Sequence, residues 1–406
     1  MPADTAPSGS KSPRHYGMDW LRIGAFALLI LYHVGLAFST WPYEFKATRA
    51  FDWVAFPLLA LNAWRLSLLF AISGYASAAV FSRTRTAGAF LRGRLARLGI
   101  PLLFSVTAVA APQAWVWLRM AMGYRHDFAW FMAHDYFTFR NIDGMVVPTW
   151  MHMWFVAYLL AYTLVLGALG LLPSRWRDGA RRCGEWVLAG PLLLPVGIAW
   201  IYAARRIPGG WIDTHDLIGD AAAHAAYLPV FLFGVLLRAS EPLRQAIAGQ
   251  WKLAGVLAIA GYAVVACVEW QYPGQMALPQ SLQEPFRIGR ATQGWGAIIA
   301  LFGLADCHWN REGRWRATLA EAVFPFYIIH QTLILLVGYW LRPLGPTPMI
   351  EFMVLVAATA GGSWLFYWLG RRIQPLRPLI GLKRHARRPQ APIEPPVGAD
   401  PSAAPG

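Results

Sequence analysis

The first strongly apolar segment of the chain begins with the run Met18-Asp19-Trp20-Leu21-Arg22-Ile23-Gly24-Ala25-Phe26-Ala27-Leu28-Leu29-Ile30-Leu31-Tyr32-His33. Its cation, Arg22, and its imidazole, His33, are both expensive inside a membrane-length helix. Eleven helical steps of about 100° leave these two side chains only about 20° apart around the helix. At ~1.5 Å per residue they are about 16 Å apart along its axis. One helix face therefore carries a charge near one membrane surface and a titratable base deep inside. The alternative is a snorkelling arginine and a histidine satisfied by a neighbouring helix.

Composition places the chain among membrane proteins. Of its 406 residues 57% are hydrophobic and 14% are charged, with a mean hydropathy of +0.39, whereas a soluble domain carries about 25% charged residues. The 21 tryptophans lie near the ends of apolar segments, as in an interfacial belt. The net charge of +15 comes mostly from short loops, so we expect a lipid bilayer and not nucleic acid as the partner.

We predict an all-α integral membrane protein with about ten transmembrane helices, using ~20 apolar residues per crossing. The ten predicted spans are 18–39, 55–81, 98–120, 150–172, 186–204, 222–239, 252–270, 289–305, 317–340 and 349–370. Lys and Arg concentrate on one side of this arrangement, which places both termini in the cytoplasm. His33, His152 and His330 then fall at similar depths in the outer half of the membrane.

One membrane domain, 18–385, is expected between two disordered cytoplasmic tails. The tail 1–17 is polar and has no apolar core, so it is not a cleavable signal peptide. The tail 386–406 is rich in proline and alanine. The three isolated cysteines lack metal-ligand spacing, and no P-loop, nucleophile elbow or dinucleotide fingerprint occurs. We therefore expect no metal and no permanently bound cofactor.

Further polar residues interrupt the apolar pattern. Arg94 and Arg97 are spaced i, i+3 in the loop that enters the third span, and two guanidinium groups on one helical face suit a phosphate. The alternative is ordinary positive-inside decoration. Arg65 lies inside the second span. The fourth span offers His152 beside the indole of Trp154, for which the alternative is an aromatic belt beside a solvated histidine.

Three other segments carry weaker signals. Pro325 in Phe324-Pro325-Phe326-Tyr327-Ile328-Ile329-His330-Gln331 is expected to kink a helix just before His330. The small residues of Ser73-Gly74-Tyr75 indicate close helix packing. The loop 121–149 combines histidines, aspartates and aromatic residues, which suit a sugar site and equally a membrane-surface loop.

Taken together, these segments resemble the membrane-bound acyltransferase-3 family over residues 18–382. The strongest element is Arg22 followed after ten residues by His33, supported by the segments 73–75, 94–97, 152–155 and 326–330. Within the family, segments 65–75, 97–101 and 227–234 resemble the branch that succinylates periplasmic glucans. Met153 and Val156 stand where the family more often has leucine, which is a conservative departure.

The resemblance implies a multi-pass enzyme of the bacterial inner membrane, an acyltransferase that transfers groups other than amino-acyl groups. It would move a succinyl or acetyl group from cytoplasmic acyl-CoA, a substrate, to a hydroxyl of a periplasmic glucan or another cell-surface carbohydrate. His33 would be the base. CoA would be held by Arg22, Arg94 and Arg97, and the acceptor or thioester would be positioned by Arg65, His152, Trp154 and His330.

Two other functions fit the same sequence. A multi-span exporter of a sugar or organic acid also carries intramembrane ionisable residues, although we detect no inverted repeat in the sequence. A non-catalytic partner in glucan synthesis is the third reading, and such a partner would not need His33. The oligomeric state, the acyl group and the acceptor are not predicted by the sequence.

Overall fold

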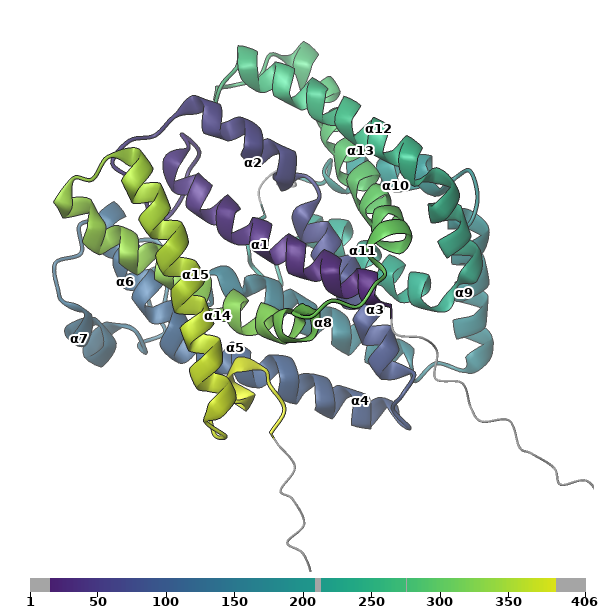
Figure 1. Ribbon diagram of the computed structural model, residues 1–406, viewed down its shortest axis with the longest axis horizontal. Helices are drawn as coiled ribbons and strands as arrows, with labels where there is room; N and C mark the ends of the chain where they lie inside the picture. The colour runs from purple at the N-terminus through teal and green to yellow at the C-terminus, as the bar shows by residue number, and fades with distance from the viewer. Residues whose placement is uncertain (1–14, 209–212, 275, 385–406) are drawn as a thin grey trace, which may run out of the picture.

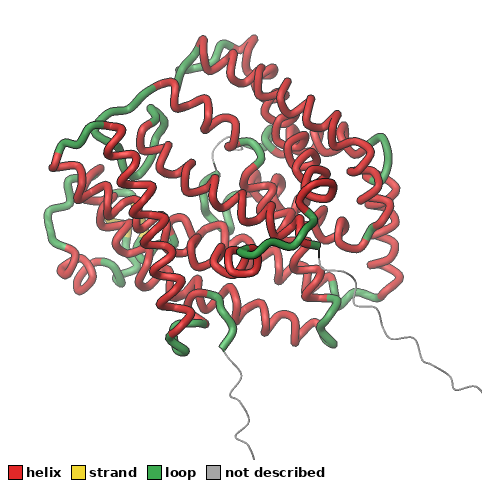
Figure 2. The backbone as a smooth tube through the Cα atoms, viewed as in Figure 1, coloured by secondary structure: helices red, strands yellow, loops and turns green. Residues whose placement is uncertain are grey.

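The computed structural model describes residues 15–208, 213–274 and 276–384, which form an almost wholly helical bundle (Figures 1 and 2). In these residues the strands are confined to one short hairpin, β1 (Asn141–Ile142) and β2 (Met145–Val146). The α-helices are α1 (Tyr16–Phe38), α2 (Ala55–Asn62), α3 (Arg65–Phe81), α4 (Ala87–Arg94), α5 (Ile100–Phe104), α6 (Ala110–Ala121), α7 (Phe128–Trp130), α8 (Trp154–Leu169), α9 (Ser174–Leu188), α10 (Leu193–Ala204), α11 (Ala221–Ala239), α12 (Glu241–Gln271), α13 (Gln280–Leu304), α14 (Arg316–Leu341) and α15 (Pro348–Arg372). The predicted all-α class is confirmed.

Helix α1 crosses the middle of the molecule in Figure 1. It contacts α2 and α3 on one side and α14 and α15 on the other. The larger apolar core joins α1 to α3, α8, α11, α13 and α14. A second apolar cluster lies around the C-terminal end of α1, against α6, α14 and the loop that follows α6. The helix that bears Arg22 and His33 therefore packs against protein along most of its length, although Gly24, Ala27 and Leu31 are exposed.

Eight helical segments are long and apolar enough to cross a membrane, and there are nine if α9 and α10 form one span. This confirms a multi-pass membrane protein, whereas the count of ten and the cytoplasmic termini stay predictions. The predicted span 186–204 is wrong as a straight helix, because α9 and α10 meet at 104°. The break falls at Gly190-Pro191, where proline lacks an N–H and restricts the residue before it.

Two helix boundaries differ from those expected. The predicted loop around Arg94 and Arg97 is helical, because Thr86 caps α4 by accepting from the N–H of Ala89 and π-helical turns carry the helix from Leu95 onward. The predicted span 55–81 is confirmed as part of one span, Asp52–Phe81, but a two-residue turn at Ala63 and Trp64 separates α2, which ends at Asn62, from α3, which starts at Arg65. A helix end therefore lies inside the second span.

Helices α3 and α11 touch backbone to backbone. A Cβ atom added at Gly74 would lie 1.9 Å from the carbonyl oxygen of Phe231, and one added at Gly234 would lie 1.9 Å from that of Ala71. Each glycine is thus the residue that lets the opposite helix approach. The close packing predicted for Ser73-Gly74-Tyr75 is confirmed.

Most of the two predicted tails lies outside the described residues. Within the part described, Tyr16 and Gly17 already belong to α1 rather than to a tail.

Helix α14 continues through Pro325. The loop after α1 is pinned by Lys46, which donates to the carbonyl oxygens of Leu36 (3.1 Å) and Ser39 (2.8 Å).

Candidate functional site

A cavity of about 720 Å³ opens where α1 ends, and we call it the histidine cavity. This volume suits a small-molecule site, which typically measures ~300–1,000 Å³. Its walls come from α1 and the loop after it, the α2–α3 junction, the start of α8, the loop before α11, and α14. It is lined by Leu29, Tyr32, His33, Leu36, Pro42, Tyr43, Glu44, Asn62, Arg65, Leu66, Leu69, Trp117, Met145, Thr149, Trp150, Met151, His152, Trp154, Phe155, Asp213, Thr214, His215, Tyr327 and Gln331.

His33 and His330 are hydrogen-bonded to each other at this wall. Nε2 of His330 lies 3.2 Å from Nδ1 of His33, and Nδ1 of His330 lies 2.8 Å from the carbonyl oxygen of Tyr327. A carbonyl only accepts, so a neutral His330 donates from Nδ1 and accepts at Nε2. His33 then donates from Nδ1, which leaves the lone pair on its Nε2. His330, which is buried, therefore selects the tautomer in which His33 can take up a proton.

His152 is held by the protein on both sides of its ring. Its Nε2 lies 3.0 Å and 3.1 Å from the carbonyl oxygens of Tyr327 and Ile328, and its Nδ1 lies 3.1 Å from Oε1 of Gln113. The ring meets that of His330 edge to face, with the centroids 5.3 Å apart. Both nitrogens are engaged, so His152 forms a fixed part of the wall. Its predicted contact with substrate stays a prediction.

Arg65 is the one Arg or Lys among the residues that line the histidine cavity. It is only 4% exposed, and its Cζ lies 3.4 Å from the centre of the Tyr32 ring. Its Nε and Nη1 have no hydrogen-bond partner in the described structure. Tyr32 is followed directly by His33, and their rings are 5.7 Å apart. The Tyr32 ring therefore contacts both His33 and the buried guanidinium of Arg65, which has two donor nitrogens without a hydrogen-bond partner.

The segment 213–220, which leads into α11, contributes to another wall of the cavity. Its His215 stacks on the indole of Trp154, with ring centroids 4.3 Å apart and planes inclined by 18°. The carbonyl oxygen of His215 accepts from Nε1 of Trp150 at 3.2 Å. The loop and the start of α8 thus form an aromatic rim around the opening.

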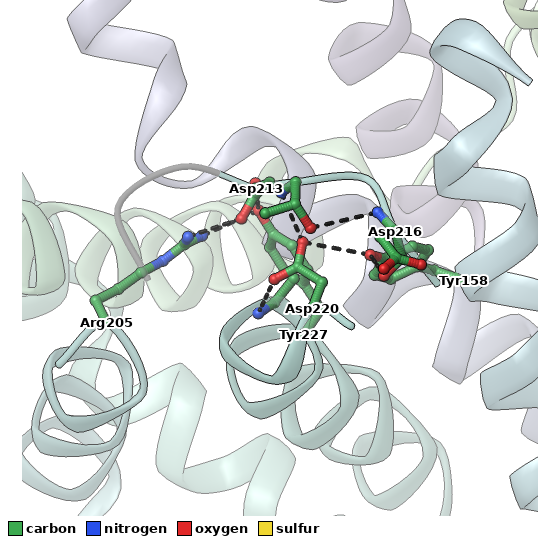
Figure 3. Close-up of polar contacts among 8 residues, drawn as sticks. Tyr158, Arg205, Asp213, Asp216, Asp220 and Tyr227 are labelled. Atoms are coloured by element: carbon green, nitrogen blue, oxygen red, sulfur yellow. Dashed lines mark hydrogen bonds and ion pairs between the residues drawn. The ribbon is translucent and has the colours of Figure 1, made fainter. Parts of the chain in front are cut away.

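A polar network fixes this loop (Figure 3). Asp213 accepts from Nη1 of Arg205 at 2.8 Å and from the hydroxyl of Tyr227 at 2.5 Å. Asp220 caps α11 by accepting from the N–H of Ala223, and it also accepts from the N–H of Thr214. Burial opposes ionisation of Asp220, but these hydrogen bonds outweigh it and hold the pKa of Asp220 below its usual value.

A second, smaller space of about 80 Å³ lies toward the other end of α1, and we call it the arginine pocket. The three arginines predicted to hold phosphate, Arg22, Arg94 and Arg97, all line it. Arg94 is buried and donates from Nη2 to the hydroxyl of Ser77 at 3.1 Å. Arg97 is exposed. The structure therefore brings together three cations from α1 and from the α4 segment.

The two spaces meet inside the bundle. Leu69, Phe155 and Tyr327 line both the arginine pocket and the histidine cavity. The arginine pocket, near the start of α1, and the histidine cavity, where α1 ends, thus share a wall formed by these three residues.

Seven of the eight site residues predicted from the sequence line these two spaces. The eighth, His330, does not line either space but is hydrogen-bonded to His33. The prediction from the sequence missed Tyr43, Glu44, Gln331 and Asp213, which also line the histidine cavity. Burial raises the pKa of Glu44 above its usual value. The only signal for Gln331 was its place directly after His330, and Asp213 had no local signal.

The loop 121–149 contributes little to the histidine cavity, through Met145 and Thr149. Its histidines instead stack on Trp130, with ring centroids 5.0 Å away for His126 and 3.8 Å away for His134. Asp127 caps α7 by accepting from the N–H of Trp130. In the described residues no group of His, Cys, Asp or Glu side chains is arranged to hold a metal ion.

Comparison with known proteins adds a family and a set of relatives. Residues 15–368 match the acyltransferase domain of the acyltransferase-3 family. The chain is 22% identical over 392 residues to the glucans biosynthesis protein C of Salmonella gallinarum, covering 93% of this chain and 97% of that protein. It is also 22% identical over 397 residues to the protein of that name from Salmonella typhimurium, covering 94% and 98%. No solved structure matches.

Proposed function

Since the chain belongs to the acyltransferase-3 family, we propose that it is an O-acyltransferase of the bacterial inner membrane. It moves a succinyl or acetyl group from cytoplasmic acyl-CoA to a hydroxyl of a periplasmic glucan or another cell-surface carbohydrate. The glucan as acceptor is supported by the name that its relatives carry. The observation that carries the proposal is the meeting of the arginine pocket and the histidine cavity at Leu69, Phe155 and Tyr327.

The arginine pocket suits the phosphates of the donor. Arg22, Arg94 and Arg97 come from two separate elements and converge on one space. Guanidinium groups bind phosphate oxygens through paired hydrogen bonds. The pocket itself is small, so it holds one charged part of the donor, and the acyl-bearing arm extends past Phe155 toward His33.

His33 acts as the general base. Its Nε2 takes the proton of the acceptor hydroxyl while the hydroxyl oxygen forms a bond to the thioester carbon. The carbonyl oxygen carries the negative charge until the C–S bond breaks, and the leaving thiolate then receives the proton from His33. His330 is a positioning residue, because it holds the Nδ1–H of His33 and so keeps Nε2 as the acceptor.

The acceptor enters from the aromatic rim. Trp150 and Trp154 line the histidine cavity beside Asp213. Aromatic faces and carboxylates are the groups with which proteins hold the faces and hydroxyls of sugars. In this arrangement the donor is bound from the arginine pocket, and the sugar hydroxyl reaches His33 from the histidine cavity, on the other side of the shared wall.

The test uses the purified full-length protein in detergent with acyl-CoA labelled in the acyl group, with and without a glucan acceptor. We expect acceptor-dependent release of CoA thiol and an equal amount of label on the glucan. An exporter would instead move solute across proteoliposomes without consuming thioester, and a non-catalytic partner would do neither. Either of those results would overturn the proposal.

A further inference from the structure

A two-residue turn at Ala63 and Trp64 interrupts the second span at the wall of the histidine cavity. Helix α2 ends at Asn62 and α3 begins at Arg65, and Asn62, Arg65 and Leu66 all line the cavity. Trp64, the residue before α3, makes no side-chain cap to the first turn. The N-terminus of a helix carries partial positive charge and unpaired N–H groups, which favour an anion. A broken membrane helix that presents this end to a cavity is a known way of placing such a site at mid-membrane depth.

Arg65 adds a full positive charge at the same place. It is 4% exposed, its Nε and Nη1 have no hydrogen-bond partner, and no described carboxylate pairs with it. A buried cation is expensive unless it is paired and its donors are met. Arg65 forms no ion pair with Glu44 or Asp213, the two carboxylates that line the same cavity, so an anionic group of a ligand can neutralise its charge.

The other arginines near the histidine cavity are either paired with a carboxylate or do not line the cavity. Arg205 is paired with Asp213 and donates to the hydroxyl of Tyr227 at 3.0 Å. Arg287 is paired with Glu284. Arg290 lies with Arg205 and Arg287 in an adjoining space of about 110 Å³ and does not itself line the histidine cavity.

We propose that Arg65, with the first turn of α3, forms the site that stabilises the oxyanion of acyl transfer. The inference rests on the proposed function. When the sugar hydroxyl adds to the thioester carbon, its proton passes to Nε2 of His33 and the carbonyl electron pair moves onto oxygen. That oxyanion faces the guanidinium of Arg65, which lies against the Tyr32 ring beside His33. The charge leaves this oxygen when the C–S bond breaks and the carbonyl forms again. Arg65 is therefore a catalytic residue, as distinct from one that holds the ground-state substrate.

The test compares Arg65→Met and Arg65→Lys with Arg342→Met, which changes an exposed arginine after α14. Loss of one oxyanion donor typically lowers kcat by ~10²–10³-fold. We expect that loss in Arg65→Met, with the KM for acyl-CoA within a few fold of wild type. Arg65→Lys keeps the charge without the planar fork and should recover part of the rate. Arg342→Met should react as wild type does.

Two further measurements separate this role from others. The melting temperature of Arg65→Met should not fall, because the change removes a buried charge without a carboxylate partner, whereas a purely structural arginine would lower it. Arg65→Met should lower kcat by the same factor with succinyl-CoA as with butyryl-CoA. A loss confined to the KM of succinyl-CoA would overturn the proposal, because Arg65 would then bind the carboxylate of the acyl group. Wild-type kcat in Arg65→Met would overturn it as well. Both results leave acyl transfer itself intact, whereas absence of transfer by wild type with either donor would overturn the proposed function and this proposal together.

Discussion

Helix α3 is built in opposite ways at its start and at its middle. At Gly74 its backbone lies against that of α11, with no room for even one added carbon atom. At Arg65, which lines the same cavity as His33 and His152, α3 begins, and this buried cation has two donor nitrogens without hydrogen-bond partners. The middle of α3 is thus packed against α11, whereas its start lines a cavity that can hold a ligand.

The difference indicates how the fold can hold Arg65, a polar side chain with donor atoms that lack hydrogen-bond partners, in a fixed position. Polar groups without partners raise the free energy of the folded state and are expected to relax if their support is loose. Here the support is the contact of α3 with α11, together with the hydrogen bond from Arg94 to Ser77 near the far end of α3. Changes at the two cavities should therefore alter rate or substrate affinity, whereas changes at the helix contact should alter stability.

The largest effect is expected at His33. A general base contributes ~10²–10⁴-fold to the rate, so His33→Gln should lower kcat by that factor, because an amide can hydrogen-bond but cannot take up a proton. Binding of acyl-CoA, followed by calorimetry, should not change. The matched control is His134→Gln, an exposed histidine of the loop 121–149, which should react as wild type does. A near wild-type rate in His33→Gln would assign the base elsewhere, with His330 and then His152 next.

The next effect concerns the arginine pocket. Replacing Arg94 and Arg97 together by alanine should raise the KM for acyl-CoA, because each charged hydrogen bond lost costs about 1.5–3 kcal/mol. Lysine at both positions should restore only part of the affinity, since it lacks the planar fork. Arg92→Ala is the control, because Arg92 is exposed on the same helix and does not line the pocket. Equal KM values in all of these variants would leave the arginines with a role in membrane orientation alone.

A third effect tests the packed part of α3. Gly74→Val should destabilise the protein by about 1–3 kcal/mol or more, because the helices must separate to admit the side chain. Gly361→Val is a matched control in α15, where an added Cβ meets no atom within 4 Å. Thermal unfolding of both variants would show the difference. Equal melting temperatures for Gly74→Val and Gly361→Val would show that the backbone contact with α11 does not stabilise α3.

Periodicity and composition were sufficient to predict the helical class, the multi-pass character and some of the residues that line the two candidate spaces. They succeed for His33 and Arg22, because one helix fixes the relation between residues eleven apart. They fail for the turn between Asn62 and Arg65, which lies in a largely apolar segment that has no proline or glycine from 58 to 73. They also fail for Asp213, because its partners Arg205 and Tyr227 are set by the path of a loop and not by any local pattern.

The smallest effect concerns the loop that covers the aromatic rim. The pKa of Asp220 is below its usual value, so its carboxylate stabilises the fold fully above the unfolded pKa of about 4 and loses this contribution as the pH falls further. Asp220→Asn keeps the helix cap, because its one amide oxygen can still accept from the N–H of Ala223, but it removes the charge and the second oxygen that accepts from the N–H of Thr214. At pH 7 the variant should therefore melt slightly below wild type, and the two melting temperatures should converge when the pH is lowered to about 3. Asp220→Ala loses the cap as well, which costs about 1 kcal/mol, and should melt below the asparagine variant at both pH values. Melting temperatures of wild type and Asp220→Asn that differ equally at both pH values would show that the charge of Asp220 does not stabilise the loop.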